Sequence, residues 1–464
     1  MYPVWEGFLF HSAFLVAIVA VAHVIFSHVT VAATWFNWWV ERKALLEDKP
    51  YLMDYLKASA LRLLMLAYTL GAMFGVGIWF SVTASNPRGI STLIHNFVFY
   101  WASEWFWFII DVFGIAVYYY TFGRVNPRTH ARIGLILALA ASGTLAIIVG
   151  ILGFKLTPGA WMQSGLSLDG FYNPTFWPML FARFGLMFAL TALYALLVAG
   201  SLPKDHPARK EVVPLAGRVG LVGLLVGVGL VLLWYMPSLP EHAKTLLRVP
   251  QAIQPVFFAE MAVGVLATFL LLVLALVRPN LAAHPVLAYG ALALAFLGLF
   301  GTERTREVLR KPDVIYGYMA SNQIRYVDLP ARGLKAEEPL LNQEGVLKHL
   351  PFAVAPGAKA AASAGGGGVD PVKAGRSLVA LECSSCHTVS RQTAFLGGMR
   401  PLAVMFARRG MTSKEQIRAY LEAIGGFPFM HPVVGTPEER DFMAAYLEKF
   451  VREYYGAKAQ GGGQ

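Results

Sequence analysis

Eight long apolar stretches recur through the first two-thirds of the chain, and they constrain the fold more than any other feature of the sequence. A helix needs about 20 apolar residues to cross the hydrocarbon core of a bilayer. Such segments lie at approximately 8–39, 60–83, 92–122, 132–154, 176–200, 215–236, 255–277 and 284–302. Of the 464 residues, 56% are hydrophobic and only 14% are charged, against roughly 25% charged in soluble proteins. We therefore predict an all-α protein with a polytopic membrane helix bundle.

The loops between these segments predict the orientation, because cytoplasmic loops are enriched in Lys and Arg. With the N-terminus outside, the inner loops hold Arg42, Lys43, Lys49, Lys57, Arg124, Arg128, Arg132, Lys204, Arg209, Lys210, Arg218 and Arg278. The outer loops between helices hold only Arg88, Lys155, Lys244 and Arg248. We expect a multi-pass protein of the bacterial cytoplasmic membrane, with the N-terminus and everything after about residue 303 outside. The basic inner loops then explain the net charge of +11. Membrane lipid is an expected partner, and nucleic acid is not.

The only two cysteines, Cys383 and Cys386, are followed directly by His387. C-x-x-C-H is the spacing of covalent haem c attachment. Two thiols three residues apart lie on one face of a helical turn and can form two thioethers to one porphyrin edge, from which the adjacent histidine reaches the iron. A structural zinc site would need four ligands, and a redox dithiol would need a βαβ context. The sequence offers neither, so we predict one covalent haem c, with His387 as an axial ligand.

The second axial ligand of this haem is expected to be a soft donor downstream. The candidates are Met399, Met405, Met411, Met430 and Met443. Met430 is favoured because GGFPFMHPVVGTPEERDFMAAYLEKF resembles the loop methionine, proline and terminal helix of cytochromes c. His431 is the rival ligand and would give a lower potential. Thr436 and Glu439 predict a capping box at the start of the terminal helix.

These features divide the chain into four parts. Residues 1–325 form the membrane domain, 326–369 a connector and a Gly/Ala-rich linker, 370–455 a small all-α class I cytochrome c domain, and 456–464 a disordered tail. The stretch 303–350 is polar and proline-containing and predicts irregular structure. The run AAASAGGGG is typical of a flexible linker.

Ionisable side chains inside a membrane cost about 2.5–3.5 kcal/mol at a helix centre on insertion scales, so each is a functional candidate. The candidates are His11, His23, His28, His95, Glu104, Asp111, Arg183, Glu260, Glu303 and Glu307. His11, His95 and Glu303 lie near predicted helix ends, where water can solvate them. His23, Asp111 and Arg183 lie too deep for that explanation.

The bundle resembles subunit I of the cytochrome bd quinol oxidases over roughly residues 10–325. VAHVIFSHVT resembles the stretch around the family's high-spin haem ligand. The resemblance implies that His23 binds a noncovalent haem of b or d type, with His28 as a packing residue or a second ligand. The alternative is that His23 only makes a hydrogen bond between helices. GAMFGVGIWFSV resembles the family's glycine-rich helix. SEWFWFIIDVFGIAVYYYTFG resembles a helix with two buried carboxylates, which implies that Glu104 and Asp111 handle protons or charge near the haems.

Two further matches lie later in the chain. FFAEMAVGVLATFLLLVLALV resembles the helix that bears the family's methionine haem ligand, which places Met261 in that role. EVLRKPDVIYGYMASNQ resembles the motif after the eighth helix. It implies that Glu307 is the haem-site glutamate, and that Arg310 and Pro312 are the motif's arginine and proline.

The chain departs from this family in two places. The family pairs its methionine with a histidine after an Asn-Pro, whereas NPTFWPMLFARFGLM has no histidine and Arg183 lies nearest to that position. We expect Arg183 to pair with a propionate or a carboxylate. The long quinol-binding loop is also missing, because only Pro237–Gln254 join the sixth and seventh segments, and the motif's tryptophan is Asp313. Quinol oxidation at the usual site is therefore not expected.

Two functions remain open from the sequence. In the first, the protein is a terminal-oxidase-like oxidoreductase that takes electrons through haem c to a membrane haem near His23 and reduces oxygen or a similar small acceptor. In the second, the bundle is a non-catalytic electron-transfer or anchoring module between a membrane partner and periplasmic cytochromes. A transporter with a sensor cytochrome is a more distant third. The expected partners are a second membrane subunit and a periplasmic cytochrome or other electron-transfer protein.

Overall fold

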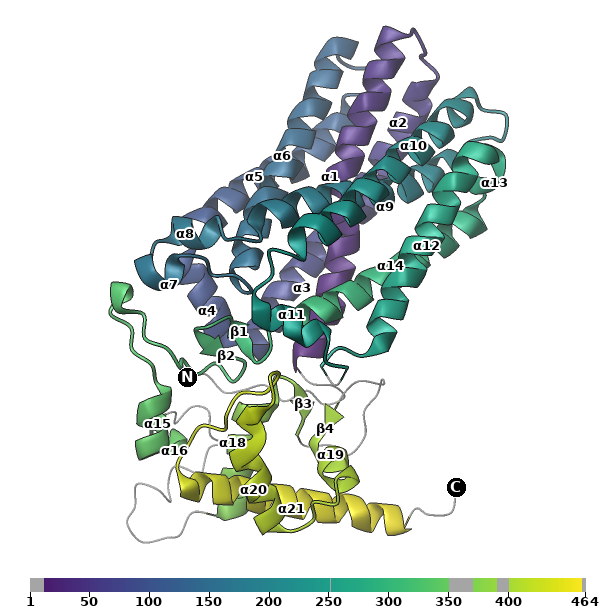
Figure 1. Ribbon diagram of the computed structural model, residues 1–464. Coiled ribbons are helices and arrows are strands. Elements are labelled where there is room, and N and C mark those ends of the chain that lie inside the picture. The colour runs from purple at the N-terminus through teal and green to yellow at the C-terminus, as the bar shows by residue number, and fades with distance from the viewer. Residues whose placement is uncertain (1–11, 251, 350–369, 390–399, 461–464) are drawn as a thin grey trace.

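A computed structural model describes residues 12–250, 252–349, 370–389 and 400–460. A long helix bundle forms one part of the molecule, and a smaller helical domain built from the C-terminal residues lies against one end of it (Figure 1). The predicted linker and His11 lie outside the described residues.

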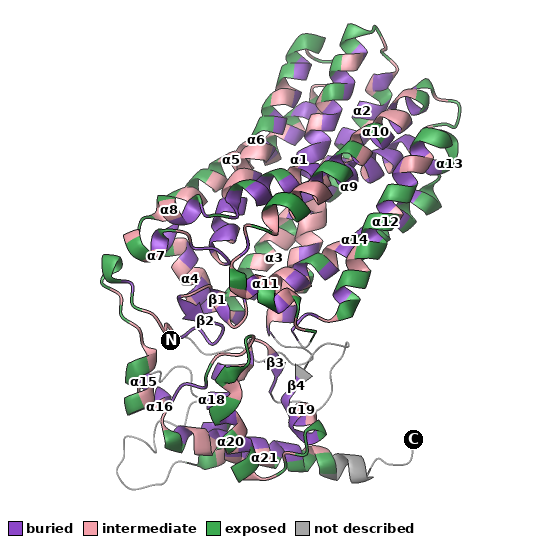
Figure 2. Ribbon diagram, viewed as in Figure 1, coloured by how far each residue is buried: buried purple, intermediate pink, exposed green. Residues whose placement is uncertain are grey.

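Among the described residues, eight helical segments are long and apolar enough to cross a membrane, which confirms the predicted number. They are α1 (Ser12–Leu46), α2 to α3 (Leu52–Arg62, a π-helical turn at Leu63–Tyr68, and Thr69–Ser85), α5 (Val98–Tyr120), α6 (Pro127–Phe154), α9 (Phe176–Gly200), α10 (Pro207–Leu230, extended by a π-helical turn at Val231–Tyr235), α12 (Pro255–Val277) and α14 (Pro285–Val308). The outer face of the bundle exposes large apolar side chains, and green exposed segments alternate with purple buried ones along the helices (Figure 2). Such a face suits contact with lipid rather than water.

The third predicted span, 92–122, is wrong as one helix. The chain forms α4 (Pro87–Asn96) and α5, separated at Phe97, whose backbone dihedrals of φ −121° and ψ 30° are not helical. Asn96 supplies the physical reason. Its side-chain oxygen accepts a 2.8 Å hydrogen bond from Trp161 Nε1, and its carbonyl accepts one from the Ser167 hydroxyl. These partners lie at the short helices α7 (Trp161–Ser164) and α8 (Ser167–Phe171), so tertiary contacts interrupt the span.

Small residues allow close helix contacts in the bundle. A Cβ added at Gly185 of α9 would lie 2.7 Å from the backbone nitrogen of Gly227 in α10, so only glycine fits there. Gly264 of α12 and Gly298 of α14 meet in the same way. Such contacts are typical of helix packing in membranes, where van der Waals contact replaces the hydrophobic effect.

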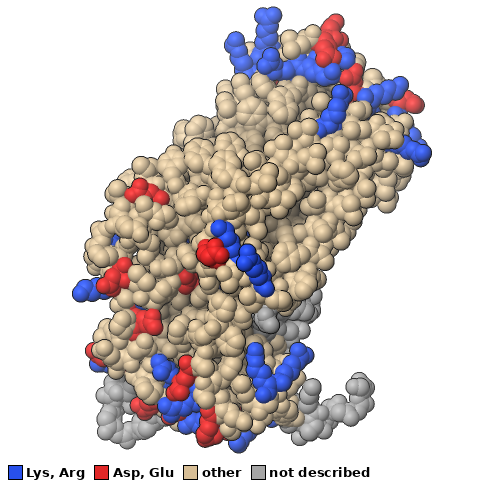
Figure 3. Space-filling view, in the orientation of Figure 1, with Lys and Arg blue, Asp and Glu red and all other residues tan. Residues whose placement is uncertain are grey.

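The charge distribution follows the bundle axis. The loops that join α1 to α2, α5 to α6, α9 to α10 and α12 to α14 lie at the end of the bundle far from the C-terminal domain. Lys and Arg gather at that end, and the middle of the bundle is a nearly uncharged band (Figure 3). This agrees with the basic loops predicted from the sequence.

The segment after α14 is more ordered than predicted. β1 (Asp313–Ile315) and β2 (Met319–Ala320) form an antiparallel pair, and a 3₁₀ turn (Pro330–Arg332), α15 (Glu338–Glu344) and α16 (Val346–His349) follow. Ile315, Tyr318 and Met319 are buried against the bundle. Their burial is a tertiary effect that the polar composition of 303–350 does not reveal.

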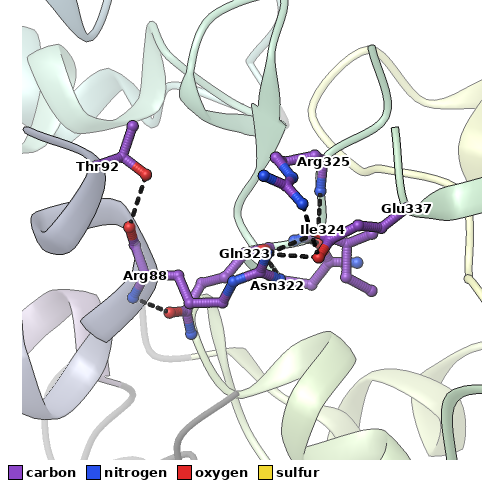
Figure 4. Close-up of polar contacts among 7 residues, drawn as sticks. All are labelled: Arg88, Thr92, Asn322, Gln323, Ile324, Arg325 and Glu337. Carbon is purple, nitrogen blue, oxygen red and sulfur yellow. Dashed lines mark hydrogen bonds and ion pairs between the residues drawn. The ribbon is translucent and has the colours of Figure 1, made fainter. Parts of the chain in front are cut away.

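Ion pairs hold this connector to α4 (Figure 4). Arg88 donates to the Gln323 carbonyl at 2.8 Å and to both carboxylate oxygens of Glu337, at 2.6 and 2.7 Å. Arg325 adds a second ion pair to Glu337 at 3.2 Å. The connector is therefore fixed to the bundle before the chain enters the C-terminal domain.

The C-terminal domain consists of α18 (Pro371–Cys383), a two-stranded sheet of β3 (His387–Thr388) and β4 (Arg400–Pro401), α19 (Leu402–Arg408), α20 (Lys414–Ala423), a 3₁₀ turn (Ile424–Gly426) and α21 (Pro437–Gln460). α18 packs on α21, and a Cβ at Gly375 would overlap the Phe442 carbonyl. Met443 is fully buried in this core. α21 continues beyond 455, so the prediction of disorder is wrong for residues 456–460; residues 461–464 lie outside the described part.

Candidate functional site

The C-S-S-C-H motif lies where α18 ends and turns into β3. Cys383 is the last residue of α18, Cys386 lies in the turn, and His387 begins β3. The Cys386 backbone N–H donates to the Cys383 carbonyl at 3.1 Å, so the motif adopts the helical turn that the spacing predicts. Both cysteines are outside any disulfide and half-buried, while His387 is buried.

This motif lines a cavity between the C-terminal domain and the bundle. The space in and around it is about 1190 Å³, part of which is open to solvent. Cys383, Cys386 and His387 form one wall, and Met430 and His431 lie on the loop before α21. The donor set therefore fits a covalent haem, with two thiols, an imidazole and a thioether or second imidazole facing one cavity.

The cavity narrows the choice of second axial ligand. Among the methionine candidates that the structure describes, Met430 lines the cavity, whereas Met405, Met411 and Met443 do not. Met399 lies outside the described residues. His431 also lines the cavity, and its Nδ1 lies 2.9 Å from the Pro432 carbonyl. Met430 and its rival His431 both stay predictions.

The thiol environment argues against a redox dithiol. Burial raises the pKa of the Cys383 thiol, and the neighbouring Glu382 carboxyl adds to this rise. Redox-active C-x-x-C motifs show the opposite shift, toward a reactive thiolate. In the described part of the chain, no three His, Cys, Asp or Glu side chains are grouped to hold a metal ion. The raised pKa of the Cys383 thiol disfavours the redox-dithiol alternative.

The bundle completes the cavity wall. Phe14 and Ala17 of α1, Phe257 of α12, and Arg304, Glu307 and Lys311 at the end of α14 all face it. Lys311 Nζ lies 2.8 Å from Cys386 Sγ. The sequence did not single out Lys311, because no local pattern relates it to a cysteine 75 positions later.

Two further contacts fix the motif to the rest of the protein. The Ser12 hydroxyl, at the start of α1, donates to the Ser384 carbonyl at 3.4 Å. Asn322 of the connector donates to Glu382 at 2.8 Å. Burial raises the pKa of Glu382 to about 8. The C-S-S-C-H motif is thus held by α1 and by the connector.

His23 lies on the face of α1 that meets α3. Its Nδ1–H donates to the Gly71 carbonyl at 2.8 Å, which fixes the tautomer and leaves Nε2 as the free lone pair. A Cβ at Gly75 would lie 3.1 Å from the His23 ring, so this ring packs closely against the glycine backbone. A histidine oriented by a backbone carbonyl against a glycine-lined helix fits an axial haem ligand.

The contacts of His28 differ from those of His23. It is buried, and Arg183 of α9 donates to its Nε2 at 3.3 Å. Arg183 also lies 3.7 Å from Glu303 of α14, so it pairs with a carboxylate, one of the two partners expected for it. His28 therefore takes part in a polar network among α1, α9 and α14.

Met261 is half-buried on α12, one residue after Glu260. Glu260 pairs with Arg304 at 3.5 Å, and the Arg304 guanidinium lies 3.8 Å from the centre of the Phe257 ring. These contacts place charged groups beside Met261 at the cavity end of the bundle. Its role as a haem ligand stays a prediction.

The carboxylates from the resemblance lie in different surroundings. Asp111 is buried and accepts a 2.6 Å hydrogen bond from Tyr68, a residue of the π-helical turn that the sequence did not single out. Glu104 is half-buried two turns earlier on α5. Glu307 is bonded to Arg310 and lies 3.3 Å from Lys311. Asp111 and Glu104 can hold or pass protons, whereas Glu307 is part of an ion-pair group at the cavity.

One buried cluster was missed by the sequence analysis. Glu41 accepts from His130 Nδ1 at 2.5 Å and from the Tyr118 hydroxyl at 2.9 Å. His130 Nε2 donates to the Tyr118 carbonyl. Glu41 follows the predicted first span, 8–39, and His130 precedes the predicted fourth span, 132–154, so neither lies within a predicted membrane segment. The helices extend further than hydropathy alone indicates.

The helix bundle is similar to a solved structure, although the sequence matches no family model. No protein-family model and no curated protein matches the chain. The structure of bd oxidase from Geobacillus thermodenitrificans superposes with a TM-score of 0.56, over 74% of this chain and 94% of that chain, at 14% sequence identity. The bundle has a bd oxidase fold. At this identity the likeness concerns the fold alone, and it agrees with the resemblance inferred from the sequence motifs.

Proposed function

We propose that this protein is a membrane-bound haem oxidoreductase in which the C-terminal domain, carrying a covalent haem c, delivers electrons to a noncovalent haem in the bd oxidase-type bundle. Oxygen or a similar small molecule is the proposed acceptor. The observation that supports this most is the shared cavity. Cys383, Cys386 and His387 face it from one side, and the bundle residues Phe14 and Glu307 face it from the other.

The geometry of α1 links the two proposed haem sites. Phe14 lines the cavity, and His23 lies nine residues further along the same helix. At 1.5 Å per residue this is about 14 Å. A haem c held in the cavity would thus be close to a haem bound by His23, without a soluble carrier between them.

Each residue then has a specific task. His23 would bind the membrane haem through Nε2, because Gly71 already occupies Nδ1. Asp111, with Tyr68, and Glu104 would hold protons on α5. The bound haems supply the electron transfer and the acceptor reduction. Met430, or His431 in its place, would complete the haem c coordination.

The proposed setting is the bacterial cytoplasmic membrane, with the C-terminal domain outside and the basic loops inside. The exposed apolar faces of α3 and α5, where Phe80 is 73% and Phe99 is 85% exposed, are available to lipid or to a second membrane subunit. A periplasmic cytochrome or another electron-transfer protein is the proposed donor to haem c.

The test is the haem content of the purified protein and of His23→Ala. The wild type should release noncovalent haem into acid acetone, and carbon monoxide should shift its reduced spectrum if the iron has an open position. His23→Ala should lose at least one equivalent of this haem, whereas the matched control His95→Ala, at the end of α4, should keep it. A wild type that contains haem c alone would refute the oxidase proposal.

The network around Arg183 favours a second candidate function. Where the family has a haem-ligating histidine, Arg183 pairs with Glu303 and His28. A bundle without that haem could serve as a non-catalytic electron-transfer or anchoring module for the cytochrome. Normal transfer of electrons to periplasmic cytochromes, with no consumption of oxygen by the purified protein, would favour this alternative.

A further inference from the structure

A group of buried cations lies between α1, α9 and α14 at the end of the bundle near the C-terminal domain. Arg306 donates to Glu303 through Nε at 3.0 Å, and Arg183 shares the same carboxylate. Arg310, just after α14, is bonded to Glu307. Lys155, at the end of α6, is close enough for the positive charges of Arg310 and Arg306 to add to the effect of burial and lower the pKa of its amine.

The charges in this group do not balance. Arg183, Arg306, Arg310 and Lys311 are four cations, whereas the carboxylates with which they pair are only two, Glu303 and Glu307. Buried charges without counter-charges are strongly destabilising. The cluster therefore carries an excess of positive charge, which a group with two negative charges would neutralise.

Two independent observations indicate that such a group would find space and donors. Arg310 is only 6% exposed, yet its Nε has no hydrogen-bond partner among the described residues. The side chains of Arg183 and Arg306 retain 15% and 20% of their accessible surface, although they lie between three packed helices. Two of the guanidinium side chains thus keep accessible surface, and Arg310 Nε is a buried donor without a partner among the described residues.

We propose that this cluster binds the two propionate carboxylates of a noncovalent haem, with Arg306 and Arg183 as the principal positioning residues. Guanidinium groups suit this role because they bind carboxylates in a bidentate manner. The inference rests on the proposed function, because it presupposes a haem in the bundle. The new element is the set of residues that hold the propionate edge of that haem and influence its midpoint potential. Arg183 then binds a propionate instead of taking the place of an iron ligand.

The test compares three substitutions in the full-length protein. Arg306→Gln removes a positive charge that stabilises the reduced haem, so the midpoint potential of the noncovalent haem should fall. We expect about a tenfold change in the reduced-to-oxidised ratio, which is 59 mV for a one-electron couple. Glu303→Gln removes a negative charge and should shift the potential in the opposite direction. Haem transfer to apomyoglobin should be faster for Arg306→Gln than for the wild type.

Arg209→Gln is the matched control. Arg209 is also buried, donates to the Leu202 carbonyl and has an Nε without a partner in the described part of the chain, but it lies at the opposite end of the bundle. It should leave the potential and the haem transfer unchanged. Equal potentials and equal haem transfer in Arg306→Gln, Glu303→Gln and the wild type would overturn the inference.

Two other outcomes separate the alternatives. If the wild type holds no noncovalent haem, the proposed function fails and this inference fails with it. If haem is present but inorganic phosphate raises the thermal stability of the wild type and not of Arg306→Gln, a free anion occupies the cluster and the propionate assignment is overturned.

Discussion

Substitution of Glu439 should loosen the C-terminal domain more than any neighbouring surface change. Glu439 is 5% exposed, and its carboxylate accepts three backbone N–H groups. Val346 N donates to Oε2 at 2.9 Å, Leu347 N to Oε1 at 2.7 Å, and Thr436 N to Oε2 at 3.0 Å. This single carboxylate thus caps α21 and also holds α16, the last element of the connector that the structure describes.

The magnitude follows from these three bonds. Hydrogen bonds to a charged acceptor contribute about 1.5–3 kcal/mol each, and a buried donor left without a partner costs about 1–3 kcal/mol. Val346 is fully buried, while Leu347 and Thr436 are half-buried, so water can replace the lost acceptor at two of the three donors. We therefore expect Glu439→Ala to cost about 3 kcal/mol. Glu439→Gln retains one acceptor oxygen and should cost less.

Hydrogen exchange of the full-length protein measures this directly. Local opening at 345–347 and at the start of α21 should become more than about a hundredfold more frequent in Glu439→Ala, since 1.4 kcal/mol corresponds to a factor of ten. Glu438→Ala, an exposed neighbour in the same helical turn, is the control and should leave the exchange within about twofold of the wild type. A cost below about 1 kcal/mol for Glu439→Ala would refute the assignment of these three hydrogen bonds.

Three further predictions concern the ligand, the topology and the pH dependence. Met430→Ala should abolish the sulfur-to-iron absorption band of haem c and lower its potential; loss of that band in His431→Ala but not in Met430→Ala would reverse the ligand assignment. Reporter fusions after residue 310 should report the outside and fusions near 48, 127 and 207 the cytoplasm, and one inverted loop would contradict the orientation. Burial raises the pKa of Asp313 from 3.8 to about 6, against the opposing hydrogen bonds from Tyr326 and Gly317 N. The folded state therefore holds this proton more tightly, so its contribution to stability is present below about pH 4 and is lost as the pH rises through about 6. Thermal unfolding should show this loss in the wild type and a flatter profile in Asp313→Asn.

The sequence alone determined the parts of this protein that depend on local pattern. Hydropathy specifies the number of spans, because each helix must cover a fixed thickness of hydrocarbon with its own residues. The bounds 176–200 and 255–277 were predicted to the residue. The C-x-x-C-H motif and the Thr436–Glu439 capping box are equally local, and the structure shows the reciprocal bonds of that box. The motifs on α1, α3 and α5 were sufficient to indicate the bd oxidase fold.

Only the tertiary structure decided which distant groups meet. The break at Phe97 depends on Trp161 and Ser167, which satisfy Asn96 from another part of the chain. The contact between Lys311 and Cys386 and the cation cluster around Glu303 join residues from separate helices. Hydropathy records the average environment of a segment, whereas a partner for a buried charge or hydrogen-bonding group is chosen by packing in three dimensions. That is why the sequence indicated which residues can bind haem, and the fold showed which cavity they share.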